Sequence, residues 1–231
     1  MVAGTWAPPN LCQPEHGYHF TIDSWLLVGF AAAFRPHFFC DLGTGCGPIA
    51  FGLASQLKHG RGVAIERSPE LAGYARQNLA RLPVTVIQGD LRFFPWKDGI
   101  FDLVACNPPY FETGSGRGRA DAKQAVARHT LYGDMDTFAS ELRWSLADGG
   151  RLCFIYPADR ASGILSRLAA SGWFLCERLD ILSFADRPPK LVCLALSSNP
   201  CPSPRADTLV LYKEHRHYTE QAIAFLRFAT N

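Results

Sequence analysis

The 231-residue sequence lacks the features of a membrane protein, of a disulfide-bonded secreted domain and of a structural zinc site. No apolar stretch approaches the roughly 20 residues that a transmembrane helix needs, and no basic segment followed by an apolar one opens the chain. The eight cysteines include no C-x-x-C pair. Four of them lie in apolar, strand-like runs: Cys40, Cys106, Cys153 and Cys193. We therefore expect a soluble, cytoplasmic protein with reduced cysteines and no bound metal.

A strong excess of charge of one sign is absent as well. Lysine and arginine number 23, and aspartate and glutamate 21, which gives a net charge of +2. Such a surface does not attract polyanions as a whole, so any nucleic-acid binding must use a local patch. No internal repeat is visible, and a chain with 48% hydrophobic residues suits one core. We predict a single domain in which residues 1–36 form an N-terminal arm and helix packed on a core of residues 37–231.

The tetrapeptide Asn107-Pro108-Pro109-Tyr110 follows an apolar run, residues 101–106, that is typical of a buried strand. The Asn107 side-chain carbonyl and the Pro108 backbone carbonyl are hydrogen-bond acceptors, and the two prolines restrict the backbone. Tyr110 adds a flat face for stacking. We expect this segment to bind a planar group with an NH2, such as adenine, guanine or a glutamine amide.

A glycine-rich loop, residues 41–47, lies upstream between a strand-like and a helix-like segment. Alternate glycines allow a tight turn and let a ligand approach the backbone closely. A dinucleotide fingerprint would have a third glycine where Pro48 stands, which disfavours a nicotinamide oxidoreductase. A nucleoside ligand needs no such glycine.

Acidic residues follow the next two apolar runs. Glu66 directly follows the apolar residues 62–65, and its carboxylate is suited to accept from both hydroxyls of a ribose. Asp90 follows residues 84–88 and is suited to accept from an adenine amino group.

This order of motifs resembles S-adenosylmethionine-dependent methyltransferases of the Rossmann-like class, whose loop motif D/E-x-G-x-G-x-G matches residues 41–47 at every fixed position. The resemblance implies S-adenosylmethionine as cofactor, with Asn107, Pro108, Pro109 and Tyr110 as the catalytic segment. The cofactor-binding residues that it implies are Asp41, Gly43, Thr44, Gly45, Gly47, Glu66, Arg67, Asp90, Leu91 and Asn107.

The fold implied is α/β: a seven-stranded, mostly parallel sheet with an antiparallel last strand and helices on both faces. Strands are expected at residues 38–42, 62–66, 84–88, 101–106, 151–156, 174–181 and 190–197, with a short strand at 208–212. Helices are expected at residues 21–34, 47–58, 69–81, 134–147 and 159–171, and from Thr219 to about Phe228. Residues 148–150 are expected to form a turn and residues 199–204 an extended linker.

The segment after the tetrapeptide, residues 111–128, combines mobile glycines with four cations. Its position suggests a loop that holds the phosphates of a nucleic-acid acceptor. The expected RNA-binding residues are Arg117, Arg119, Lys123 and Arg128.

Three further segments make the resemblance more specific: residues 17–24 (Gly-Tyr-His-Phe-Thr-Ile-Asp-Ser), residues 127–129 and residues 218–220. They are similar to segments of the bacterial tRNA-valine adenine-N6 methyltransferase family, in which His19 is usually an arginine and His129-Thr130 a His-Glu pair. The resemblance implies methylation of the exocyclic N6 of an adenine in a tRNA anticodon loop.

Other methyl acceptors remain open at this point. Ribosomal RNA (at adenine N6 or guanine N2) and the glutamine amide of a release factor are alternatives, because enzymes with the same tetrapeptide act on them. A non-catalytic RNA- or cofactor-binding module is the alternative from outside the enzymes. The Asp23-Ser24 pair is open to two interpretations, a helix cap or a substrate contact.

Overall fold

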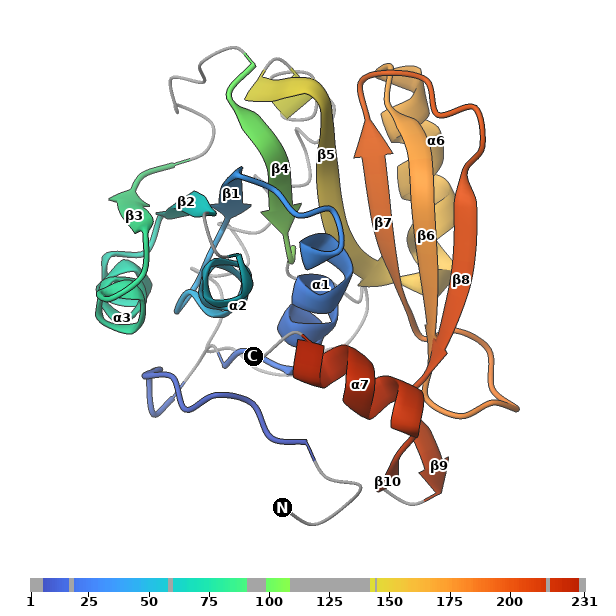
Figure 1. Cartoon of the computed structure of the whole chain (residues 1–231), viewed down its shortest axis with the longest axis horizontal. Coiled ribbons are helices and arrows are strands. Elements are labelled where there is room, and N and C mark those ends of the chain that lie inside the picture. The colour runs from blue at the N-terminus through green and yellow to red at the C-terminus, as the bar shows by residue number, and fades with distance from the viewer. Residues whose placement is uncertain are drawn as a thin grey trace, which may run out of the picture.

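The computed structural model describes residues 6–16, 19–57, 60–90, 99–108, 142–143, 145–214 and 217–228. An eight-stranded sheet in the order β3-β2-β1-β4-β5-β7-β6-β8 runs through these residues (Figure 1). Its strands are β1 (Phe38–Leu42), β2 (Arg61–Glu66), β3 (Val84–Gln88), β4 (Phe101–Cys106), β5 (Leu146–Pro157), β6 (Phe174–Leu182), β7 (Leu191–Ser197) and β8 (Arg205–Val210). A separate antiparallel pair consists of β9 (Tyr212–Glu214) and β10 (His217–Tyr218).

The strand directions confirm a mostly parallel Rossmann-like sheet. Strands β1, β2, β3, β4 and β5 pair in parallel, whereas β7 is antiparallel to both β5 and β6. The helix-free connection from β6 to β7 makes them a hairpin, as expected. The last of the seven predicted strands, β7, is the antiparallel one, and it lies between β5 and β6. One detail differs from the prediction: β8 joins the sheet as an eighth strand, parallel to β6.

The start of β5 was predicted wrongly. The sequence pattern predicts helix to residue 147 and a turn at residues 148–150, but β5 already begins at Leu146. Between two successive pairings β5 advances by five positions, from Leu146 to Arg151, while β4 advances by two, from Phe101 to Leu103. The register therefore shifts here. The glycines of the expected turn therefore lie within this bulge instead of before the strand. Of the helix predicted at residues 134–147, Leu142, Arg143 and Ser145 are helical, whereas residues 134–141 lie outside the described residues.

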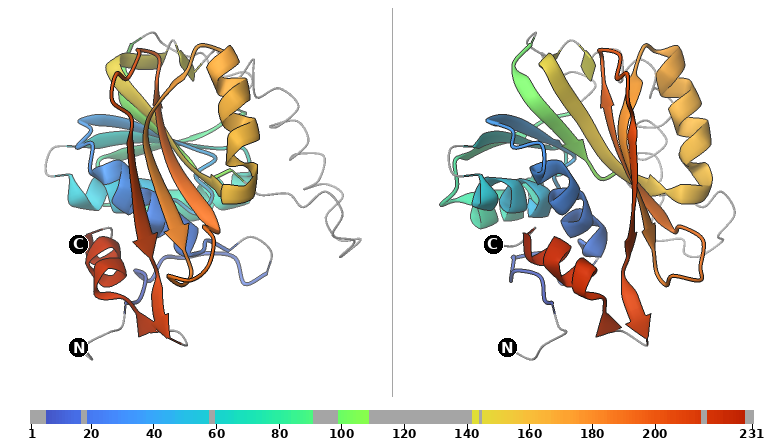
Figure 2. Two further views of the ribbon diagram at one scale, coloured as in Figure 1. Left: turned by 90° about the vertical axis from the view of Figure 1, so that its right-hand side faces the viewer. Right: turned by 45° about the vertical axis from the view of Figure 1, so that its right-hand side comes forward.

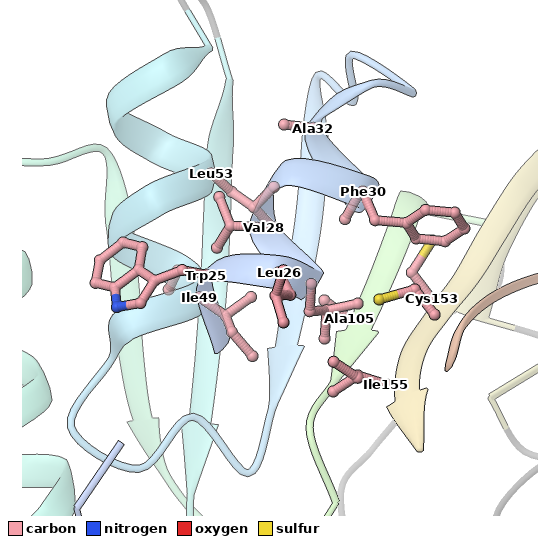
Figure 3. Close-up of a cluster of buried hydrophobic side chains, with 14 of the residues drawn as sticks. Trp25, Leu26, Val28, Phe30, Ala32, Ile49, Leu53, Ala105, Cys153 and Ile155 are labelled. Carbon is pink, nitrogen blue, oxygen red and sulfur yellow. The ribbon is translucent and has the colours of Figure 1, made fainter. Parts of the chain in front are cut away.

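The helices cover both faces of the sheet (Figure 2). They are α1 (Ile22–Ala32), α2 (Pro48–Gln56), α3 (Pro69–Leu79), the 3₁₀ turn η2 (Ala158–Arg160), α6 (Ala161–Ala170) and α7 (Glu220–Phe228). Alternate residues of β4 and β5 belong to two separate buried clusters. Ala105 and Ile155 pack under α1 and α2, as Figure 3 shows, whereas Val104 and Phe154 pack with residues of α6.

One expectation about the cysteines is corrected. Cys176 on β6 and Cys201 in the Pro-rich linker form a disulfide, with their Cα atoms 5.3 Å apart. The pairing of β6 with β8 brings the linker beside β6, and that long-range pairing was not part of the sequence prediction. The other six cysteines are free. No helix among the described residues has the length and apolar character to cross a membrane.

Candidate cofactor and acceptor site

The candidate residues follow the ends of four parallel strands. Registers Leu42↔Ile65, Leu42↔Cys106 and Glu66↔Gln88 place the ends of β1, β2, β3 and β4 at one edge of the sheet. The carboxyl edge of a parallel sheet is where ligands bind in such folds. The glycine loop, Glu66, Asp90 and Asn107 therefore share this edge, as the sequence order predicted.

The glycine loop makes the turn that its glycines predict. Gly43 and Gly47 have φ values of 65° and 89°, a region that favours glycine. A Cβ added at Gly43 would meet no atom within 4 Å, so this side of the loop is open. A Cβ at Gly47 would lie 3.1 Å from Leu79 of α3, so this glycine allows close packing instead. The loop thus combines an open side with a packed side.

Asp41 supports the loop from beneath. Its side chain is fully buried, and its Oδ2 accepts from the Thr44 hydroxyl (2.5 Å) and from the Ala50 amide of α2 (3.0 Å). Its Oδ1 is buried without a hydrogen-bond partner within the described part of the chain. Burial raises the pKa of Asp41 to about 7, against the lowering effect of the Thr44 and Ala50 hydrogen bonds. Through these contacts Asp41 connects the glycine loop to the start of α2. Its contact with the cofactor stays a prediction.

We expect the Asp41→Asn variant to lose part of the pH dependence of stability. Folding raises the pKa of Asp41 from 3.8 to about 7, so its stabilising contribution is full below about pH 4 and is lost as the pH rises through about 7. Asparagine does not titrate. The free energy of unfolding, measured in thermal melts from pH 5 to pH 8, should therefore decline more steeply for the parent than for the variant, by at most about 1.4 kcal/mol per pH unit. Equal slopes would show that the Asp41 pKa is ordinary.

Glu66 joins the glycine loop to the next helix. Its Oε2 accepts from the Gly45 amide (3.0 Å) and its Oε1 accepts from the Ser68 amide (2.8 Å). Ser68 caps α3 by accepting from the Leu71 amide, which confirms the predicted helix start. Each carboxylate oxygen can accept more than one hydrogen bond, so the two oxygens, held in a fixed plane, retain acceptor capacity for a pair of hydroxyls.

Arg67 and Asp90 lie beside this carboxylate. An Arg67 Nη1 atom is 3.8 Å from an Asp90 Oδ2 atom, and the Arg67 side chain is 49% exposed. Such an exposed pair contributes little to stability. The pair lies just past the carboxyl end of β3. Leu91 lies outside the described residues.

Asn107 has a partner that the sequence analysis missed. Its Nδ2 donates to the Ser24 hydroxyl of α1 (3.4 Å), and Ser24 is only 1% exposed. Thr21 caps α1 by accepting from the Asp23 amide, so Ser24 is not the cap. The sequence offered only the Asp23-Ser24 pair at a helix start as a signal. The contact connects α1 to the acceptor segment across 83 residues.

Several predicted site residues cannot be placed. Pro108 is described and half-buried directly after Asn107. The residues outside the described part of the chain are Leu91, Pro109, Tyr110, Arg117, Arg119, Lys123 and Arg128. Their roles stay predictions.

Comparison with solved structures shows the fold. A predicted O-methyltransferase from Agrobacterium tumefaciens has a TM-score of 0.68 and 19% identity, over 90% of this chain and 97% of its own. A TehB-like methyltransferase from Corynebacterium glutamicum has a TM-score of 0.54 and 18% identity, over 78% and 89% of the two chains. Both are methyltransferases of this architecture.

Comparison of sequences shows the family. The model of a methyltransferase domain matches residues 39–133. A Glaesserella parasuis protein named tRNA1(Val) (adenine(37)-N6)-methyltransferase is 30% identical, over 88% of this chain and 86% of that protein. A Salmonella arizonae protein of the same name is 32% identical, over 80% of this chain and 76% of that protein. With its glycine loop and Asn107 at one sheet edge, the chain belongs to the tRNA1(Val) (adenine(37)-N6)-methyltransferase family.

Proposed function

We propose that this chain transfers a methyl group from S-adenosylmethionine to the exocyclic N6 of an adenine in the anticodon loop of a tRNA. The observation that carries the proposal is the position of Asn107, at the end of β4 and at the same edge as the glycine loop and Glu66. The names of the relatives, which give adenine 37 of tRNA1(Val), support this acceptor, and we propose the same position for this chain. The substrate implies a cytoplasmic enzyme.

The cofactor site is proposed on chemical grounds. The open side at Gly43 suits close approach of a ligand to the backbone. Glu66 is assigned to the ribose hydroxyls and Asp90 to the adenine amino group of the cofactor. S-adenosylmethionine, when bound, supplies a methyl group on an electrophilic sulfonium.

Asn107 and Pro108 act on the acceptor nitrogen. The lone pair of adenine N6 is delocalised into the ring, which makes it a poor nucleophile. Hydrogen bonds from the N6 amino group to Asn107 Oδ1 and the Pro108 carbonyl favour a pyramidal nitrogen with a localised lone pair. These bonds strengthen as positive charge develops on nitrogen, so they stabilise the transition state more than the ground state. No base is needed before transfer, because the methylated amine loses its proton readily.

The rest of the acceptor site is a prediction from the sequence. Tyr110 is assigned to stacking on the adenine, and the cations of residues 111–128 to the phosphates of the tRNA. An adenine in an anticodon loop is already unpaired, which keeps the cost of exposing it small.

A methylation assay with three acceptors tests the proposal. Purified protein and labelled S-adenosylmethionine are mixed with unmodified tRNA, with ribosomal RNA or with a release factor, and the digested products are identified by mass spectrometry. We expect N6-methyladenosine in tRNA. Methylguanosine in ribosomal RNA or methylglutamine in the release factor would overturn the acceptor, and label in no pool would favour a non-catalytic module.

We also expect the Ser24→Ala variant to be slower. Without the Ser24 hydroxyl, the Asn107 amide loses a partner that fixes its plane, and one such hydrogen bond contributes about 0.5–1.5 kcal/mol. The single-turnover rate at saturating cofactor should therefore fall about 2- to 10-fold.

Two control variants make this measurement specific. Ser24→Thr keeps the hydroxyl and should keep most of the rate. Ser162→Ala, exposed on α6 at the opposite face of the sheet, should match the parent. Equal rates for Ser24→Ala and the parent would show that this contact does not position Asn107.

A further inference from the structure

The N-terminal arm, residues 6–16, is attached to the glycine loop through one side chain. Asn78 of α3 accepts from the Cys12 amide with its Oδ1 (2.8 Å), and its Nδ2 donates to the Cys12 carbonyl (2.8 Å). The same Nδ2 donates to the carbonyl of Cys46, a loop residue (2.8 Å). One amide therefore bonds to two segments that are 34 positions apart in the chain (46 − 12).

An amide is the group that these three bonds require. The NH2 group of Asn78 donates to two carbonyl oxygens, and its side-chain oxygen accepts from an N–H group. A carboxylate has no hydrogen for either carbonyl, and an apolar side chain meets none of the three. The arrangement thus depends on asparagine at this position.

The arm has two further attachments to the body of the protein. Leu11 is 8% exposed and belongs to the buried cluster under α1 and α2. Trp6 packs edge-on against Trp25 of α1, with ring centroids 6.4 Å apart, and Figure 3 shows Trp25 on the side of α1 next to α2. Figure 1 shows the arm, in dark blue, passing below α2. The arm is therefore docked rather than loose.

The contact with Cys46 adds to the hydrogen bonds that fix the conformation of the glycine loop. The Glu66 carboxylate accepts a hydrogen bond from the Gly45 amide, and the Ile65 carbonyl accepts one from the Thr44 amide. The Asn78 amide donates a hydrogen bond to the carbonyl of Cys46, the residue after Gly45, and Cys46 is fully buried. A loop held in one conformation binds a ligand with less ordering cost than a loop that must be fixed on binding.

We propose that Asn78 is a positioning residue that couples docking of the N-terminal arm to cofactor binding. The inference depends on the proposed function, in which residues 41–47 contact S-adenosylmethionine. Arm docking and cofactor binding favour the same loop conformation. Coupling of this kind is reciprocal, so the cofactor stabilises the docked arm as much as the arm stabilises the bound cofactor.

Hydrogen exchange of the unaltered protein tests one direction of the coupling. The Cys12 amide is protected by its bond to Asn78, so its exchange reports arm docking. We expect saturating S-adenosylmethionine to slow exchange in a peptide that contains residues 10–14 by about 5-fold or more. Binding of the cofactor without any change in this peptide would overturn the coupling.

Cofactor affinity of variants tests the other direction. Asn78→Ala should weaken S-adenosylmethionine binding in calorimetry by about 5- to 10-fold, and Asn78→Asp, which loses both donors, by at least as much. Alanine is the better helix former, so lost helix propensity is not the cause. The kcat at saturating cofactor should be unchanged, because Asn78 does not touch the reacting atoms. Gln77→Ala, an exposed neighbour on α3, is the matched control.

The outcomes separate this inference from the proposed function. No S-adenosylmethionine binding by the parent would overturn both. Binding by the parent and equal affinity of folded Asn78→Ala would overturn the coupling alone. A loss of kcat with unchanged affinity would also contradict it.

Discussion

The Asn107→Ala variant should lose nearly all turnover while it keeps its affinity for S-adenosylmethionine. The side-chain oxygen of Asn107 is assigned to the acceptor nitrogen, where charge develops only in the transition state. Loss of one such preorganised group lowers kcat by about 10²- to 10³-fold in other enzymes. The measurement is a single-turnover rate with tRNA, together with calorimetric binding of the cofactor.

A second substitution distinguishes the contribution of the Asn107 side-chain oxygen from that of its NH2 group. Asn107→Asp keeps an acceptor oxygen but loses the Nδ2 donor to Ser24. Its rate should lie between those of the parent and Asn107→Ala. Full turnover in Asn107→Ala would refute the assigned role, and simultaneous loss of cofactor binding and of a cooperative melt would indicate misfolding rather than lost chemistry.

The Glu66→Ala variant should bind S-adenosylmethionine at least about 100-fold more weakly. Hydrogen bonds to a charged group contribute about 1.5–3 kcal/mol each, and two ribose hydroxyls are assigned to this carboxylate. The substitution also releases the Gly45 and Ser68 amides, so the loop loses a restraint. Isothermal calorimetry measures the change directly.

An acid on α3, the helix that follows Glu66, provides the control. Glu70 is exposed in the first turn of α3 and contributes a similar negative charge at this edge. Glu70→Ala should bind the cofactor like the parent. Parent-like binding by Glu66→Ala would show that the ribose lies elsewhere.

Local signals predicted much of the architecture. Strands β1, β3 and β4 begin and end where the apolar runs do, because each run is bounded by loop residues. Ser68 caps α3 and Thr219 caps α7, where Thr219 Oγ1 accepts from the Ala222 amide. Both caps can be predicted from the sequence, because the capping residue directly precedes the helix that it stabilises. The common edge of the site follows from the same strand ends.

The parts that were missed depend on distant contacts. The bulge at the start of β5 reflects pairing with β4. A strand was predicted at residues 208–212, but its start at Arg205, among four exposed residues, depends on pairing with β6. The disulfide follows from that same pairing. The contacts of Asn107 with Ser24, and of Asn78 with Cys12, cross 83 and 66 positions. No local pattern predicts such contacts, because they exist only once the fold has formed.

Mapping the methyl group on a defined tRNA tests the central claim most directly. Two unmodified transcripts of tRNA1(Val), one with adenine and one with guanine at position 37, are incubated with the protein and labelled S-adenosylmethionine. The products are digested and analysed by mass spectrometry. We predict N6-methyladenosine in the adenine-37 transcript and no label in the other. Equal labelling of both transcripts, or a methyl group on any other atom, would contradict the proposed reaction.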